Sequence, residues 1–390
     1  MSSILPGMAF DGAAPQVLVV GAGPAGLAVA GALRYRRIRA EVIERAADVA
    51  SSWRAHYERL CLHTVKEQSA LPHLPFPRAF PRYVPRDKVV DYLAGYARHF
   101  NIAPRFGEEA IAIRREGAQW RVNCASGRQH VCDAVVLATG ANHVPVMPAF
   151  PNQGAFSGQT LHSRDYREPR AFAGRRVLVV GMGNTGAEIA LDLAEHGAQV
   201  ALSVRSPVNV VYRDVLGRPT QLTSIMLSRL PPRVGDKLAL ALRDLTVGDL
   251  RKWGLQTSPT SPLRQLREEG RTPVIDVGTL AMIKRGAIAV RPGVASFTPD
   301  GVRFTDDTAQ PFGAVIMATG FHGGVAGLFP DLELEVDAKG LPSHVAGQGD
   351  FEGAYFVGYD IRQAGGLLRA IAHQAMDVAQ AIGSRSPLRA

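Results

Sequence analysis

Cysteine is scarce in this sequence. The 390 residues include three cysteines, Cys61, Cys124 and Cys132, and no two of them form a CxxC pair. An odd number of widely spaced cysteines gives no disulfide framework. We therefore expect a reducing compartment, with the cytoplasm as the simplest choice.

The usual short motifs for metals and for serine hydrolases are also missing. The histidines, His56, His63 and His73 among them, form neither an HExxH motif nor a Cys/His zinc pattern. The GxSxG turn that presents a nucleophilic serine is absent as well. The sequence thus predicts no metal and gives no support to a serine hydrolase.

A long apolar run able to cross a membrane is lacking. Residues 1–33 are nearly uncharged, but they carry no basic segment of the kind that begins a signal peptide, and Pro6, Gly7, Asp11 and Pro15 interrupt them. We expect a tail followed by a buried strand and helix, in a soluble protein without membrane attachment.

Charged residues make up 20% of the chain and hydrophobic residues 46%, which is typical of soluble globular proteins. The formal net charge of +9 arises from 44 basic and 35 acidic residues. Such an excess suits nucleic acid, a membrane surface or a phosphate-rich cofactor equally well. The densest basic run, at residues 34–39, lies between a predicted helix and strand, where we expect a solvated face and no nucleic-acid partner.

The first glycine-rich loop, residues 21–26, has the sequence GAGPAG and follows a β-branched apolar run at residues 16–20. Gly21 permits the tight turn, Gly23 lets the backbone approach a pyrophosphate, and Gly26 allows close packing of helix and strand. The helix that follows directs its amides at the phosphates. A second strand, residues 40–43, ends at Glu44, whose carboxylate can accept hydrogen bonds from a ribose diol. This combination predicts an FAD-type dinucleotide site.

The second glycine-rich loop, residues 181–186 (GMGNTG), repeats the pattern with Gly181, Gly183 and Gly186 after the run RVLVV. The next strand, residues 199–204, is followed by Arg205, which we place where the first unit has Glu44. An arginine there suits a 2′-phosphate that a carboxylate would repel, and Ser203 can add a hydrogen bond. The pattern predicts an NADPH-type site, and a surface arginine without a nucleotide role stays the alternative.

Two apolar runs end in Thr-Gly, VVLATG at Thr139 and Gly140 and VIMATG at Thr319 and Gly320. Each falls where the chain would cross between domains. We therefore predict an α/β fold with two dinucleotide-binding, Rossmann-like domains, the NADPH domain being inserted into a discontinuous FAD domain. The predicted boundaries are residues 14–168 and 319–385 for the FAD domain and 169–318 for the NADPH domain.

A fingerprint lies just before the second loop. Phe156, Gly158, His162 and Tyr166 match FxGxxxHxxxY, and on these residues the chain resembles the class B flavin monooxygenases. Residues 56–87, 215–220 and 270–288 are similar to the matching stretches of the YUCCA-type subgroup. That resemblance implies FAD, NADPH and O2 as reactants, a C4a-(hydro)peroxyflavin, and oxidative decarboxylation of an aryl 2-oxo acid such as indole-3-pyruvate.

The resemblance also implies further site residues. FAD contacts are expected at Trp53, Arg54, Ala110 and Asp360. Asn184 is expected to contact NADP and the peroxide, with a plain turn residue as the alternative. His63 stands where amine- and sulfide-oxidising relatives carry asparagine, and with Lys66 it is a candidate to bind a substrate carboxylate or an oxyanion. The alternatives are packing against the flavin for His63, a salt-bridged loop position for Lys66, and core packing for Trp53.

Other reactions stay open from the sequence. Hydroxylation at nitrogen or sulfur and Baeyer-Villiger oxidation use the same cofactors. An NADPH oxidase or reductase and a redox sensor that holds FAD without turnover are alternatives of other classes. The expected partners are a small-molecule substrate and O2, with a homodimer left open.

Overall fold

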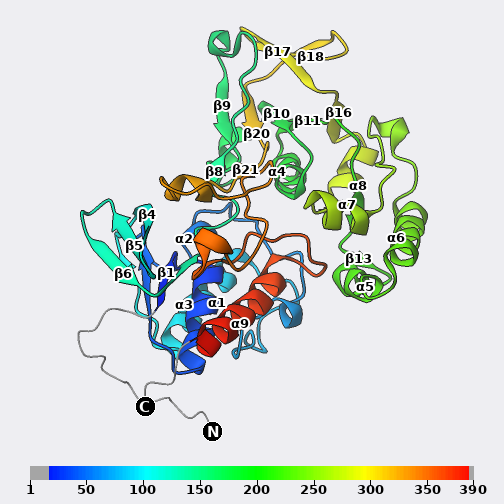
Figure 1. Ribbon diagram of the computed structural model, residues 1–390. Coiled ribbons are helices and arrows are strands. Elements are labelled where there is room, and N and C mark those ends of the chain that lie inside the picture. Colours follow the sequence, from blue (N-terminus) through cyan, green and yellow to red (C-terminus); the bar gives the residue numbers. More distant parts are fainter. Residues whose placement is uncertain (1–16, 386–390) are drawn as a thin grey trace.

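The computed structural model describes residues 17–385, so the expected N-terminal tail, residue 14 and Gln16 lie outside the described residues. Figure 1 shows two lobes, one built from both ends of the chain (blue and red) and one from its middle (green and yellow). Each lobe contains a five-stranded sheet whose strand pairs are parallel. This is the arrangement of two Rossmann-like domains, and it confirms the predicted fold class.

The first sheet has the order β22-β7-β1-β2-β3. Its central strands are apolar and fully buried, as expected for parallel strands that are covered on both faces. Helix α1 is buried along most of its length because α3 and α9 pack against it. The strands and helices are β1 (Val17–Val20), α1 (Pro24–Tyr35), β2 (Ala40–Glu44), α2 (Ser51–Arg54), α3 (Arg86–His99), β3 (Arg105–Phe106), β7 (Ala134–Leu137), β22 (Ala354–Phe356) and α9 (Leu367–Arg385).

The second sheet has the order β16-β11-β10-β20-β9. Strand β9 precedes the predicted boundary at residue 168, yet it pairs with β20 of this sheet. The division of the chain at residues 168 and 318 stays a prediction. The elements are β9 (Gln159–His162), β10 (Arg176–Val180), α4 (Asn184–Glu195), β11 (Gln199–Ser203), α8 (Thr279–Lys284), β16 (Ile288–Arg291) and β20 (Ala314–Met317).

The chain passes between the lobes twice, and the two crossings lie side by side. Strand β8 (Val144–Pro145) follows the first Thr-Gly run and β21 (Phe321–His322) follows the second. These two strands pair antiparallel, with Phe321 opposite Pro145. The loops at the carboxyl ends of β7 and β20 are therefore held next to each other.

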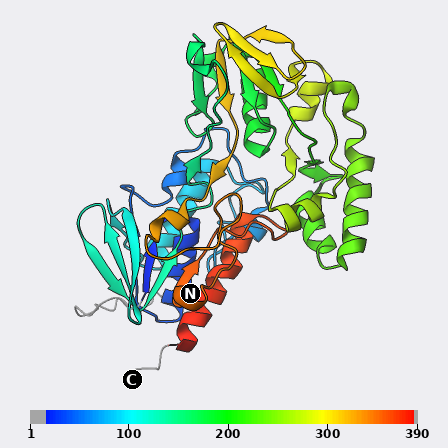
Figure 2. The ribbon, with the colours of Figure 1, turned by 45° about the horizontal axis from the view of Figure 1, so that its top comes forward.

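Smaller units flank the two large sheets (Figure 2). One three-stranded sheet packs on the first lobe, another extends the second, and a group of helices stands to the side of the second. These elements are β4 (Ala110–Glu116), β5 (Gln119–Cys124), β6 (Gln129–Cys132), β12 (Val210–Tyr212), β13 (Asp214–Val215), β14 (Arg218–Pro219), α5 (Thr220–Leu227), α6 (Pro232–Val247), α7 (Pro262–Glu269), β15 (Val274–Asp276), β17 (Val294–Thr298), β18 (Gly301–Phe304) and β19 (Ala309–Pro311). Among the described residues, no helix is both long and apolar enough to cross a membrane.

Candidate active site and cofactor-binding loops

The first glycine-rich loop has the geometry of a dinucleotide site. Gly21 adopts a φ of +109°, and a Cβ built there would lie 2.6 Å from the carbonyl oxygen of Ala138. A Cβ on Gly26 would lie 1.8 Å from the carbonyl oxygen of Gly21, whereas a Cβ on Gly23 would meet no protein atom within 4 Å. Gly21 and Gly26 are therefore required by the fold, and the open face at Gly23 fits a pyrophosphate at the start of α1.

Glu44 lies at this loop, as predicted. Its carboxylate is buried and accepts hydrogen bonds from the backbone N–H groups of Ala22 (2.7 Å) and Ala46 (2.9 Å). Oε1 also accepts the Ser51 hydroxyl at 3.4 Å, whereas Oε2 accepts the Ala22 N–H alone and keeps a lone pair for a ribose hydroxyl. The backbone bonds orient the acid for that contact.

The other expected FAD contacts lie around the same loop. Trp53 is partly buried against the core of the first lobe, and Arg54 is exposed, bonded to the Val49 carbonyl and paired with Asp48 at 2.8 Å. Ala110 begins β4 and packs against a second core cluster of this lobe. The Asp360 carboxylate accepts the N–H of Arg362 at 3.0 Å, which stabilises its own turn.

Tyr359 is a residue that the sequence reasoning missed. Its hydroxyl bonds the Thr139 hydroxyl at 2.7 Å and accepts the Thr139 N–H at 3.2 Å. Burial raises its pKa to about 12, so the phenol stays neutral. Tyr359 thereby fixes the end of β7, where Gly140 has a φ of +94°. In the sequence, Tyr359 could have been noticed only through its position next to Asp360, an expected FAD contact.

The second glycine-rich loop repeats this geometry. Gly181 has a φ of +106°, and a Cβ there would lie 2.6 Å from the carbonyl oxygen of Ala318. A Cβ on Gly186 would lie 2.0 Å from the Gly181 carbonyl oxygen, while Gly183 again has nothing within 4 Å. The second loop thus fits a second dinucleotide.

The strand register corrects one detail of the sequence comparison. Val20 pairs with Ile43 in the first sheet and Val180 pairs with Ser203 in the second, so the counterpart of Glu44 is Val204 rather than Arg205. Arg205 lies one residue further and is exposed, with no ion-pair partner in residues 17–385. Ser203 is buried and donates its hydroxyl to the Pro292 carbonyl at 2.7 Å. Its side chain is therefore already engaged with the backbone.

A cavity of about 610 Å³ lies between the second glycine-rich loop, the helices α5 to α7 and the segment before α9. Most of its lining is apolar. Of the predicted residues it includes Gly183, Asn184, His63, Thr319 and Gly320. The cavity is also lined by Arg213, Arg243 and Lys339, and within residues 17–385 no aspartate or glutamate lines it.

Two of the three predicted catalytic residues meet at this cavity. Asn184, the first residue of α4, donates Nδ2–H to the Pro273 carbonyl (3.1 Å) and accepts the Ile275 N–H (2.7 Å). One amide hydrogen and one lone pair remain for a ligand. Lys66 does not line the cavity; its Nζ donates to the carbonyls of Arg78 and Phe80, which secures a loop.

His63 belongs to a buried polar network that sequence reasoning missed. Its Nε2 lies 3.2 Å from Oε1 of Glu188 without hydrogen-bond geometry. The Tyr57 hydroxyl donates to Oε2 of the same carboxylate at 2.5 Å. Burial, together with Glu188, raises the pKa of Tyr57 well above its ordinary value. Since Glu188 lies on α4, the network ties the loop after α2 to the second lobe.

The fingerprint residues Tyr166, His162 and Phe156 contact other protein groups and do not line the cavity. Tyr166 donates its hydroxyl to Asp192 at 2.7 Å, one helical turn after Glu188 on the same face of α4. His162 is buried, accepts the Arg164 N–H at Nδ1 and therefore donates from Nε2 to the Gly320 carbonyl at 3.1 Å. Burial lowers the pKa of His162, which keeps the ring neutral. Phe156 packs against the ring of Phe297. It also packs against Gly158, where a Cβ would lie 2.4 Å from the Phe156 ring.

The comparisons with known proteins agree with this geometry. Residues 14–336 match the model of a family described as flavin-binding monooxygenase-like. The chain is 38% identical over 384 residues to indole-3-pyruvate monooxygenase YUCCA4 of Oryza sativa subsp. japonica, covering 94% of this chain and 88% of the relative. It is 41% identical over 322 residues to YUCCA1 of the same organism, covering 81% and 79%.

Among solved structures, a mutant flavin monooxygenase from Stenotrophomonas maltophilia superimposes with a TM-score of 0.72 at 25% identity, covering 95% of this chain and 98% of that one. The expected resemblance to YUCCA-type enzymes and the flavin-dependent monooxygenase reaction are thereby confirmed. On the match over residues 14–336, the chain belongs to the flavin-binding monooxygenase-like family.

Proposed function

We propose that this protein uses FAD, NADPH and O2 to convert an aryl 2-oxo acid, such as indole-3-pyruvate, into CO2 and the carboxylic acid one carbon shorter. The reaction consumes one NADPH and one proton and releases NADP+ and water. The observation that carries the proposal is the charge of the cavity. Arg213, Arg243 and Lys339 line it, and no carboxylate does within residues 17–385.

This charge distinguishes the candidate substrates. A 2-oxo acid and the phosphates of NADPH are anions, and a cavity with only basic charged groups attracts both. A tertiary amine is a cation at neutral pH and is repelled by the same groups. The apolar remainder of the lining suits an aromatic ring. The YUCCA relatives, which carry indole-3-pyruvate in their names, support the same choice.

Arg213 is the basic residue best placed to hold the substrate carboxylate. Arg243 is buried and donates to the Ser258 carbonyl and to Asn209, so its guanidinium is committed to the fold. Lys339 donates to the Gly270 carbonyl at 2.9 Å, and burial lowers its pKa. Arg213 instead stacks over Tyr83, with its Nε 3.3 Å from Asp214, and most of its donors stay open.

The chain's other residues have supporting roles in this proposal. The first loop with Glu44, Thr139 and Gly140 holds FAD, and the second loop with Arg205 holds NADPH. Bound reduced flavin supplies the activation of O2. His63 lies at the cavity with Glu188 behind it, where the pair can hold a proton beside the developing oxyanion, and Asn184 has one free N–H for the same purpose.

The test is NADPH-dependent turnover of indole-3-pyruvate and phenylpyruvate beside a thioether and a tertiary amine, with hydrogen peroxide measured in each. We expect coupled release of CO2 and the shortened acid. If the 2-oxo acids gave only peroxide while a sulfoxide or N-oxide accumulated, the substrate assignment would be wrong. Peroxide with every substrate would indicate an NADPH oxidase, and a flavin that NADPH never bleaches would indicate a redox sensor.

The variant Arg213→Gln sharpens this test. We expect it to raise the KM for a 2-oxo acid by about 10-fold or more, since a charged hydrogen bond contributes about 1.5–3 kcal/mol, and to leave the KM for a neutral thioether unchanged. Arg233→Gln on α6 is the matched control, because this exposed arginine does not line the cavity. If Arg213→Gln changed the KM values for the 2-oxo acid and the thioether equally, Arg213 would not be the residue that binds the substrate carboxylate.

A cytoplasmic location belongs to the same proposal. Cys61, Cys124 and Cys132 are all free thiols in the fold, and free thiols persist in a reducing compartment. The homodimer and the absence of a nucleic-acid partner stay predictions.

A further inference from the structure

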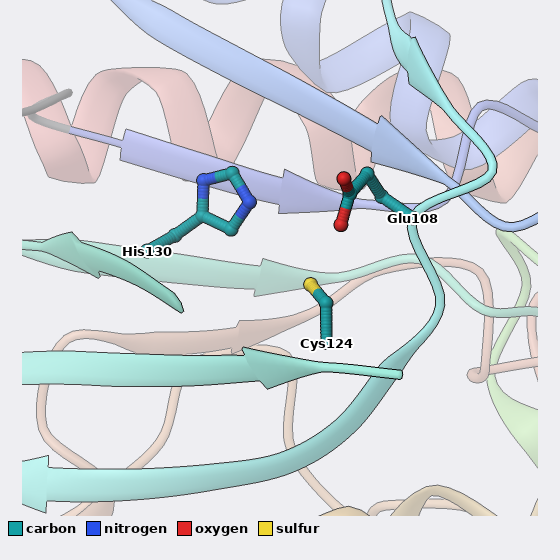
Figure 3. Close-up of side chains that lie close together, drawn as sticks. All are labelled: Glu108, Cys124 and His130. Carbon is teal, nitrogen blue, oxygen red and sulfur yellow. The ribbon is translucent and has the colours of Figure 1, made fainter. Parts of the chain in front are cut away.

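Three side chains with metal-binding atoms come together away from the cavity. Glu108 follows β3, Cys124 ends β5 and His130 lies on β6, and one ligand atom of each lies within 4.8 Å of the other two. All three residues are buried, with exposed fractions of 5%, 3% and 7%. None of them lines the cavity described above. Figure 3 shows the carboxylate, the sulfur and the imidazole facing a common space.

The His130 ring supplies an independent indication of a ligand. Its Nε2 is buried and has no hydrogen-bond partner in the described structure. Figure 3 shows this nitrogen on the side of the ring that faces Glu108 and Cys124. A buried ring nitrogen without a partner is unfavourable and rare in native proteins. An ion between the three groups would satisfy it.

The surroundings orient the three groups for that purpose. Nδ1 of His130 faces Oε2 of Glu41 at 3.7 Å, which favours a proton on Nδ1 and leaves the lone pair on Nε2. A carboxylate behind the imidazole is the usual support of a metal-bound histidine. The Glu108 oxygens accept from Ser126 (2.8 Å) and from Arg128 (2.7 Å). The Cys124 thiol also donates to this carboxylate, so an ion would take the place of the thiol proton between the two groups.

We propose that Glu108, Cys124 and His130 bind one divalent transition-metal ion of the zinc class. A thiolate, an imidazole and a carboxylate together suit Zn²⁺, whereas Ca²⁺ and Mg²⁺ prefer oxygen ligands alone. Bonds of about 2.0–2.3 Å in a tetrahedron place the ligand atoms about 3.3–3.8 Å apart, so the ion draws atoms that lie within 4.8 Å together by up to roughly 1.5 Å. The thiol releases its proton on binding, and water takes the fourth position.

The site has a structural role in this proposal. The ion links β5 and β6 of the small sheet to the loop after β3 at the edge of the first large sheet. The Glu108 N–H donates to the Glu44 carbonyl at 3.0 Å, so the linkage reaches the residue expected to bind the FAD ribose. Short-motif searches miss the three ligands because they lie on a loop and two strands, without a recognised spacing. Only the folded sheets bring them together.

The test uses FAD-loaded protein that has been freed of metal with a chelator. Zn²⁺ is titrated against a competing indicator, and Co²⁺ is used for its thiolate charge-transfer absorbance. We expect one ion per chain, a higher unfolding midpoint with Zn²⁺, and a cobalt-thiolate band. The variants Cys124→Ser and His130→Ala should lose the band and bind Zn²⁺ at least about 100-fold more weakly, and Glu41→Gln about 10- to 100-fold more weakly.

Cys132→Ser is the matched control, because Cys132 is a second buried thiol of the same small sheet, bonds backbone groups and is not part of the cluster. This variant should bind both ions as the original protein does. FAD content reports folding in every variant. The proposal is overturned if folded protein takes up no stoichiometric ion, or if Cys124→Ser keeps the cobalt-thiolate band or the original Zn²⁺ affinity.

Discussion

Gly23 and Gly26 lie in the same loop, yet an alanine should have opposite effects at the two positions. At Gly26 the added Cβ would lie 1.8 Å from the Gly21 carbonyl oxygen and 3.3 Å from Cγ1 of Val19. Relieving the first contact to 3.0 Å requires the start of α1 to move by roughly 1.2 Å within a close-packed core. We therefore expect Gly26→Ala to lower the free energy of unfolding by about 3 kcal/mol.

At Gly23 the same methyl group meets no protein atom within 4 Å, and the φ of −78° suits alanine. The gain of about 0.4–1 kcal/mol from a stiffer unfolded chain is offset by the poorer N-cap, so stability should stay within about 1 kcal/mol of the original. The open face is where the pyrophosphate should lie. A methyl group there should weaken FAD binding by about 10- to 100-fold, or roughly 1–3 kcal/mol.

Denaturant unfolding of the flavin-free proteins and titration with FAD separate the two effects. Gly183→Ala is the internal control, because its Cβ also meets nothing within 4 Å. It should raise the KM for NADPH and leave FAD content unchanged. A Gly23→Ala protein that binds FAD with the original affinity would refute the assignment of the open face, and an unchanged unfolding curve for Gly26→Ala would refute the packing argument.

Three further predictions concern single side chains. Arg205→Ala should raise the KM for NADPH by about 10-fold and that for NADH far less; equal changes would mean that Arg205 does not contact the 2′-phosphate. Tyr57→Phe leaves the Glu188 carboxylate buried with one bond fewer, so it should cost about 1–3 kcal/mol of stability, measured by denaturant unfolding. The Tyr359 phenol stays neutral to about pH 12 in the fold but ionises near pH 10 when unfolded. Its contribution, about 3 kcal/mol, is complete below pH 10 and disappears as the pH rises to 12, so Tyr359→Phe should flatten the loss of stability in that window.

The fold was predictable because its strongest signals are local. Each glycine-rich loop lies between an apolar strand and a helix, and at Gly26 and Gly186 the atom that excludes a Cβ is a carbonyl oxygen of the same loop, that of Gly21 or Gly181. Strand register depends on pairing between residues far apart in the sequence. The comparison of the two units therefore matched Arg205 to Glu44, whereas the register matches Val204 to Glu44.

The buried side-chain networks could not be predicted in this way. Glu188 and Asp192 are the two acidic residues in the buried stretch of α4, and nothing in the sequence identifies Tyr57 and Tyr166 as their partners. Lys66 illustrates the same limit in the opposite direction. The resemblance made it a catalytic candidate, but the carbonyls that it bonds belong to a loop whose path depends on the whole fold.

These two tyrosine–carboxylate pairs explain how the cavity keeps its shape. Tyr57 comes from a loop of the first lobe and Tyr166 from the fingerprint, and both pack in the core of the second lobe while their hydroxyls reach successive turns of α4. Asn184 begins that same helix at the cavity, and the Glu188 carboxylate lies 3.2 Å from His63, which also lines the cavity. Since an unpaired buried carboxylate is costly, α4 is held in one register against the first lobe. Tyr166 of the fingerprint thus supports the helix that begins with Asn184, although none of the four fingerprint residues lines the cavity.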